Sequence, residues 1–179
     1  MSGRPTPDYL AAYPPALVAR VHQLIEQQRF AAWLLQRYPQ AHGIRTDAAL
    51  YEHVQELKAA HLRMAVPLGK VCFDSRIHAV RNALGTHAAI SRVQGSRLQA
   101  KREIRIASVF RDMPAEFLRM IVVHELAHLR QPAHDKAFYQ LCLYMEPQYH
   151  QYEFDLRAYL CFRECSGQSL WSASPRREP

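Results

Sequence analysis

A long apolar stretch from Phe117 to Leu129 constrains the fold of this chain most, because few polar residues interrupt it. Among those few are His124, Glu125 and His128. A helix that is apolar over most of its surface is buried in a core. Buried imidazole and carboxylate groups are costly unless they find partners. The stretch therefore predicts a central helix whose two histidines meet a partner inside the protein, and a bound cation would satisfy both.

The spacing of the histidines is typical of a metal site. Two of them lie four residues apart, which on a helix places them about 40° apart around the axis and one turn apart along it. Pro132 is expected to end the helix, so that the chain can bring His134 back to the same point. Three neutral imidazoles with an open fourth position hold catalytic zinc in proteins. The pattern therefore predicts Zn²⁺ bound by His124, His128 and His134. Glu125 occupies the place of a general base for zinc-bound water.

Local signals indicate where the helices around this motif begin and end. Asp112 is suited to cap the start of the helix and Pro114 to its first turn, and the helix is expected to end near residue 131. Asp135 is predicted to be the N-cap of a following helix over residues 136–145, which would determine where the preceding histidine points. Another helix is expected from about residue 148 to 160.

The first third of the chain is predicted to be helical. Apolar residues recur at helical spacing over about residues 15–38, and again over 46–62. These two helices are expected to form a hairpin that packs on the remainder. Pro67 and Gly69 break the pattern and mark a border between the two parts.

One strand is indicated clearly, and others weakly. From Arg102 to Ala107, Ile104 and Ile106 alternate with charged residues, which is typical of a half-buried strand. Shorter strands are expected near residues 71–73, 77–80 and 88–93. If the strand over 102–107 forms the edge of the sheet beside the metal, its free backbone groups can pair with an extended peptide substrate.

These elements predict an α+β fold. A small mixed sheet is expected with an active-site helix carrying the HExxH motif, preceded by the N-terminal helical hairpin. The expected division is a helical extension over 1–64, a metal-dependent hydrolase domain over 65–165, and a flexible tail over 166–179.

The motif also resembles a known family. Residues 122–130 together with His134 and Phe138 resemble the YgjP-like metallopeptidase-domain family, relatives of the SprT-like zinc proteases. The resemblance extends over roughly residues 65–160. It implies a reduced zincin-like fold, the three histidines as metal ligands, and Glu125 as the catalytic acid and base. Gln131 stands where metzincins have a glycine, so the metzincins are excluded.

Composition limits the possible environments and partners. The chain has 179 residues, of which 23 are basic and 16 acidic, giving a net charge of +7. Part of this excess lies in the segment 92–111, which can attract nucleotide phosphates, nucleic acid or acidic proteins, although a solvated strand face explains it as well.

We find no membrane span and no signal peptide, so a cytoplasmic location is expected. The four cysteines show no disulfide framework.

The sequence therefore predicts a zinc-dependent hydrolase, in the first place a cytoplasmic metallopeptidase that cleaves peptide bonds through a zinc-activated water. Two alternatives stay open: a metal-dependent hydrolase of nucleoside triphosphates, and a non-catalytic zinc-binding module. A group that stabilises the oxyanion is also expected, without a choice among four candidates, which are Tyr139, Tyr144, Tyr149 and His150. The oligomeric state is not predicted.

Overall fold

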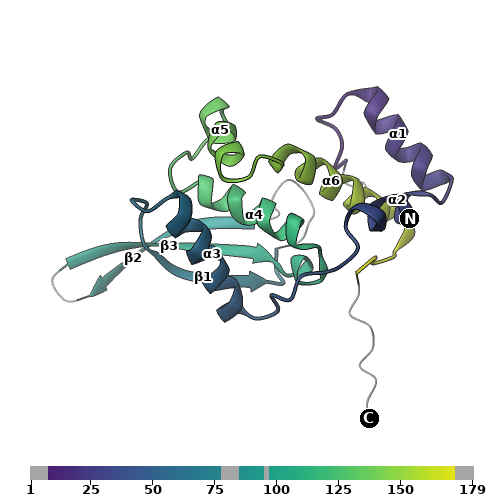
Figure 1. Ribbon diagram of the computed structural model, residues 1–179. Helices are drawn as coiled ribbons and strands as arrows, with labels where there is room; N and C mark the ends of the chain where they lie inside the picture. Colours follow the sequence, from purple (N-terminus) through teal and green to yellow (C-terminus); the bar gives the residue numbers. More distant parts are fainter. Residues whose placement is uncertain (1–7, 78–84, 95–96, 172–179) are drawn as a thin grey trace, which may run out of the picture.

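The computed structural model describes residues 8–77, 85–94 and 97–171, with side chains over 8–77 and 102–171. In these ranges six α-helices and a small sheet form a mixed α+β fold, as predicted (Figure 1). The helices are α1 (Pro15–Glu26), α2 (Phe30–Arg37), α3 (Asp47–His61), α4 (Ala115–Ala127), α5 (Lys136–Met145) and α6 (Tyr149–Ser166). The strands are β1 (Leu68–Asp74), β2 (Gly85–Gln94) and β3 (Arg97–Ala107), and a 3₁₀ turn η1 (Ser108–Asp112) leads into α4.

One face of the sheet is apolar. Val71 and Phe73 of β1 lie opposite Ile104 and Ile106 of β3, and all four side chains are buried. Successive side chains of a strand point to opposite faces, so these four share one face. Helix α3 packs along β1, and α4 packs against β2 and β3. The alternation predicted for residues 102–107 is therefore confirmed.

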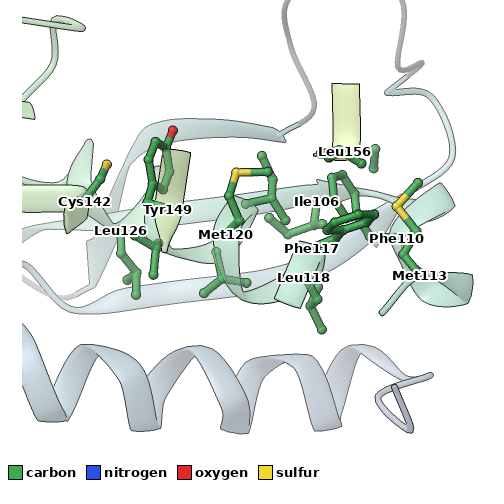
Figure 2. Close-up of a cluster of buried hydrophobic side chains, with 14 of the residues drawn as sticks. Ile106, Phe110, Met113, Phe117, Leu118, Met120, Leu126, Cys142, Tyr149 and Leu156 are labelled. Carbon is green, nitrogen blue, oxygen red and sulfur yellow. The ribbon is translucent and has the colours of Figure 1, made fainter. Parts of the chain in front are cut away.

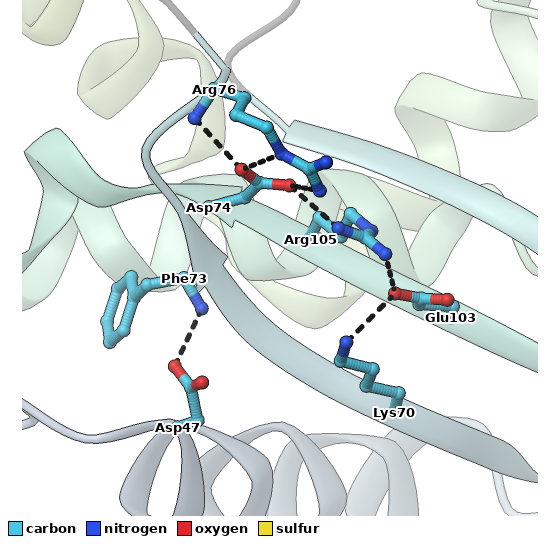
Figure 3. Close-up of polar contacts among 7 residues, drawn as sticks. All are labelled: Asp47, Lys70, Phe73, Asp74, Arg76, Glu103 and Arg105. Carbon is cyan, nitrogen blue, oxygen red and sulfur yellow. Dashed lines mark hydrogen bonds and ion pairs between the residues drawn. The ribbon is translucent and has the colours of Figure 1, made fainter.

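The opposite face carries a network of ion pairs (Figure 3). Arg105 donates to Asp74 at 2.8 Å and lies 2.6 Å from Glu103. Arg76 donates to the same Asp74 at 2.9 Å, and Lys70 lies 3.8 Å from Glu103. These hydrogen bonds, first of all those from Arg76, hold the pKa of the Asp74 carboxyl well below its usual range. Glu103 and Arg105 of the alternating pattern are thus paired with each other and with residues of β1.

Strand β3 lies in the middle of the sheet, in the order β1-β3-β2. It pairs with β1 in parallel and with β2 antiparallel, so residues 102–106 are matched on both sides. The strand is therefore not a sheet edge, and the condition for pairing with an extended peptide is not met at residues 102–106. The parallel partner β1 lies far upstream in the chain. The alternation within residues 102–107 does not reveal this pairing. Of the strand expected at 77–80, the structure describes only Ile77, which belongs to no strand. Residues 78–80 lie outside the described residues.

Helix α4 forms the centre of the core, as its apolar stretch predicts. Figure 2 shows its side chains Phe117, Leu118, Met120 and Leu126 surrounded by residues from the sheet, η1, α5 and α6. Each of these four is at most 1% exposed. The helix therefore places Glu125, and His128 at its C-cap, inside the protein and leaves His124 partly buried.

The two ends of α4 differ from the prediction. Pro114 is the N-cap, and Asp112 belongs to η1, where its carboxylate pairs with Arg45 instead of capping the helix. The last helical residue is Ala127, four residues before the expected end, and His128 is the C-cap. Asp112 does not cap the helix because its carboxylate forms an ion pair with Arg45. The sequence around the helix does not reveal this distant partner.

The N-terminal part contains three helices rather than two. Gln28 adopts a left-handed conformation with φ 56°, which interrupts the predicted 15–38 helix between α1 and α2. Phe30 at the start of α2 is fully buried and stacks on Phe162 of α6. The expected hairpin is therefore wrong: α2 packs on α6, while α3 packs on the sheet (Figure 1). The start of α3 is as predicted, since Thr46 caps it by accepting from the Ala49 amide.

The segment after α6 is anchored where the structure describes it. Gly167, with φ 68°, ends the helix in the left-handed conformation that suits glycine. The Trp171 side chain is only 6% exposed, and its indole N–H donates to the Tyr38 carbonyl at 2.8 Å. This anchored segment differs from the loose tail expected from residue 166. The reason is that burial of the large apolar indole stabilises the folded chain. Residues 172–179 lie outside the description.

Candidate metal centre

The end of helix α4 and the loop that follows it bring the predicted imidazoles together. His124 lies in the last turn of α4, His128 is its C-cap, and His134 lies in the loop before α5. The Nε2 atoms of His124 and His128 are 3.2 Å apart, and that of His134 lies 3.1 and 2.9 Å from them. Nitrogens bound at 2.0–2.1 Å to one tetrahedral Zn²⁺ stand roughly 3.3 Å apart. The donor set therefore fits a single divalent cation.

Two further contacts orient the rings of His124 and His128. The Nδ1 atom of His128 lies 3.0 Å from the Gln131 carbonyl oxygen, which can only accept. The His128 Nδ1–H therefore donates, and its Nε2 keeps a lone pair. The Nδ1 atom of His124 lies 2.7 Å from the hydroxyl oxygen of Tyr149. Neither contact was expected from the sequence, because one partner is a backbone group and the other comes from a different helix.

An aromatic ring closes the apolar side of the site. Phe138 is fully buried, and its ring centroid lies 4.9, 4.5 and 4.8 Å from those of His124, His128 and His134. Asp135 holds this part of the chain by accepting a 2.9 Å hydrogen bond from the Phe138 amide. The predicted N-cap of α5 is therefore confirmed. Because this cap immediately follows the third histidine, the local structure helps to place its ring.

The site opens to solvent on one side. His128 is buried and His124 partly buried, whereas His134 is exposed. Glu125, beside His124 in the chain, is only 2% exposed. A metal held here would thus lie between one buried ring, one partly buried ring and one exposed ring, which leaves the exposed side for a substrate.

The four candidates for oxyanion stabilisation lie at different depths. Tyr149 is buried behind His124, and the half-buried Tyr139 ring lies 6.4 Å from that of His134. Tyr144 is 65% exposed and contacts His61. His150 lines a groove of about 1200 Å³ between α1 and α6. Tyr139 is therefore the candidate next to the open side.

Comparisons with known proteins agree with this geometry. The YgjP-like metallopeptidase domain matches residues 73–159, a range that contains all three histidines. A UTP pyrophosphatase of Escherichia coli (strain K12) is 57% identical over 152 residues, which cover 85% of this chain and 91% of that protein. The chain belongs to the YgjP-like family. No solved structure matches it significantly.

The relative overturns one prediction. This YgjP-like chain is a hydrolase of a metal-dependent family, but the predicted metallopeptidase activity is wrong, since the relative is a UTP pyrophosphatase. The nucleotide hydrolase that the sequence left as an alternative agrees better with this finding. The physical reason is that a cation on three imidazoles can polarise a phosphoryl oxygen as well as a carbonyl oxygen. The ligand motif therefore does not determine the substrate.

The basic segment 92–111 of this YgjP-like protein is only partly described. Arg105 is engaged by Asp74 and Glu103 on the outer face of the sheet. Arg111 lies over the Phe73 ring, 4.8 Å from its centroid. The side chains of Arg92, Arg97 and Lys101 lie outside the description. A role of the segment in phosphate binding therefore stays a prediction.

Two other expectations concern the cysteines and the membrane. All four cysteines are free, and Cys72 and Cys142 are buried, in agreement with the absence of a disulfide framework. Among the helices that the structure describes, none is both long and apolar enough to cross a membrane.

Proposed function

We propose that this chain is a metal-dependent nucleotide pyrophosphatase that hydrolyses UTP to UMP and pyrophosphate. The observation that carries the proposal is the 57% identity to a UTP pyrophosphatase over most of both chains. It is supported by the imidazole cluster, which lies inside the matched family domain. We assign hydrolysis to residues 65–165 and regard residues 1–64 as a helical extension.

The proposed metal ligands are His124, His128 and His134. Three imidazoles in this arrangement suit Zn²⁺, and an HExxH helix followed by a third histidine is the arrangement of a reduced zincin. When bound, such a cation neutralises phosphoryl charge and lowers the pKa of a water molecule. The burial of His128 against Phe138 keeps bulk water from one side of the site.

Glu125 is the proposed general base. It takes a proton from the attacking water while the water oxygen forms a bond to the α-phosphorus. The bond between that phosphorus and the oxygen bridging to the β-phosphorus then breaks, and pyrophosphate leaves with the electron pair. Support comes from the burial of Glu125 and from its place next to His124 in the chain. General acid–base catalysis of this kind contributes about 100- to 10,000-fold.

Two exposed cations suit the charged end of the substrate. Arg130 follows His128 by two residues, and Lys136 follows His134 by two. Both side chains are exposed. Exposed cations close to the ligands in the chain attract a polyphosphate by charge.

A substrate panel tests the reaction class. The purified protein with one equivalent of Zn²⁺ is incubated with UTP, with other nucleoside triphosphates and with an unfolded protein, and products are separated by ion exchange. We expect UMP and pyrophosphate from UTP, and no peptide release. In water enriched in ¹⁸O, attack at the α-phosphorus places the label in UMP. Release of peptides without UTP hydrolysis would contradict the proposal, and label in pyrophosphate would contradict the point of attack.

A matched pair of variants tests the base. Glu125→Gln is compared with Glu116→Gln, which lies in the first turn of the same helix. We expect Glu125→Gln to lose at least about 100-fold in turnover while it keeps its metal, and Glu116→Gln to remain as active as the wild type. Full activity of Glu125→Gln would remove this residue from the mechanism.

A further inference from the structure

Tyr149 lies directly behind the proposed metal ligands. It is the first residue of α6 and is fully buried (Figure 2). Its hydroxyl oxygen is 2.7 Å from Nδ1 of His124, and the two rings are nearly parallel, at 16°. A buried hydroxyl at this distance from an imidazole nitrogen makes a strong hydrogen bond, and its direction decides which ring nitrogen of His124 carries the proton.

One direction is compatible with a metal ligand. If the Tyr149 oxygen accepts from a proton on His124 Nδ1, the neutral imidazole keeps the lone pair on its Nε2 atom. That lone pair is the one available to a cation between the three rings.

The opposite direction conflicts with the centre of the cluster. If Tyr149 donated to His124 Nδ1, the neutral imidazole would carry its proton on Nε2. That atom lies 3.2 Å from Nε2 of His128 and 3.1 Å from Nε2 of His134. A proton there would occupy the space between the rings and leave His124 without a lone pair for a cation.

We propose that Tyr149 is a positioning residue that holds His124 with its proton on Nδ1, so that the Nε2 lone pair faces the other two imidazoles. The inference rests on the proposed metal-binding role of His124.

The affinity for metal tests the role with a matched control. Tyr149→Phe removes one oxygen and keeps the ring, and Tyr159→Phe does the same at another buried tyrosine of α6 whose hydroxyl contacts Ser169. Zn²⁺ binding is measured by competition with a coloured chelator. We expect Tyr149→Phe to bind Zn²⁺ about 10- to 100-fold more weakly than wild type, and Tyr159→Phe to bind it normally. Equal affinities in the two variants would overturn the proposal.

The position of the proton is measured independently of metal and activity. In the metal-free wild-type chain, ¹⁵N–¹H correlation spectra of the histidines should show the His124 proton on Nδ1. A proton on Nε2 would overturn the proposal, even if Tyr149→Phe failed to fold. If the wild type neither bound metal nor hydrolysed UTP, the proposed function would fail, and these spectra would still decide the role of Tyr149.

Discussion

The hydroxyl of Tyr38 donates a 2.6 Å hydrogen bond to the carboxylate of Asp155, and that carboxylate is completely buried. Tyr38 directly follows α2, and Asp155 lies in the middle of α6, so the bond joins the N-terminal helices to the helix that carries Tyr149. Arg37 lies 3.2 Å from the same carboxylate and Gln151 donates to it at 3.0 Å. A buried carboxylate needs several donors, and here three side chains supply them.

Removing the Tyr38 hydroxyl should destabilise the fold. Tyr38→Phe keeps the ring but deprives Asp155 of one donor, which costs about 1–3 kcal/mol. The measurement is the free energy of unfolding in urea. Tyr51→Phe is the control, because Tyr51 is 37% exposed and its variant should stay within about 0.5 kcal/mol of wild type. Equal stability of both variants would show that Tyr38 contributes only through its ring.

The cap of α5 should matter for stability and for metal binding. Asp135 and Thr46 each cap a helix by accepting from a backbone amide, but only Asp135 adjoins His134. Asp135→Ala and Thr46→Ala should each cost about 1 kcal/mol in unfolding free energy. Asp135→Ala alone should also weaken Zn²⁺ binding, because the loop with the third histidine loses its anchor. If both variants bound Zn²⁺ like wild type, the cap would have no part in placing His134.

The exposed histidine should affect the metal and not the fold. His134→Ala should abolish tight Zn²⁺ binding, while the metal-free variant unfolds within about 0.5 kcal/mol of the metal-free wild type. The reason is that His134 is exposed and that its Nε2 atom faces the other two imidazoles. Wild type with Zn²⁺ at 100 times its dissociation constant should gain about 2.7 kcal/mol, and the variant none. Thermal unfolding with and without a chelator measures both effects.

Asp74 should make stability depend on pH in the acid range. Hydrogen bonds from Arg76 and Arg105 hold its pKa below the ordinary 3.8 in the folded chain. A carboxyl with a lowered folded pKa stabilises the fold above its ordinary value and loses that contribution as the pH falls below it. Asp74→Asn should therefore be less stable than wild type at pH 7, and the difference should shrink below about pH 4. A difference that stayed constant from pH 7 to 3 would contradict this.

Trp171 should fasten the end of the chain to the core. Its ring contacts Phe117 and Tyr159, and its indole N–H donates to the Tyr38 carbonyl. Trp171→Ala removes this packing and should cost about 3–5 kcal/mol of unfolding free energy. Leu17→Ala, at a side chain that is 37% exposed, is the control and should cost far less.

Much of the metal site is local in the chain and was therefore predictable. The four-residue spacing of His124 and His128, the turn near Pro132 and the cap at Asp135 each act within one or two helical turns. The prediction of β3 from Ile104 and Ile106 succeeded for a similar reason, because the alternation of one strand records which face is buried. The prediction that Asp112 caps the start of α4 failed, because its carboxylate pairs with Arg45, which lies 67 residues away in the chain.

The sequence by itself determined which imidazoles converge and that a buried helix carries them, because helical periodicity and capping are properties of neighbouring residues. Only the tertiary structure decided that Tyr149 lies behind His124, 25 residues away, that β3 is the central strand, and that Trp171 bonds to Tyr38 across 133 residues. Such contacts depend on how separate elements pack, and packing depends on the shape of the whole core rather than on any one segment.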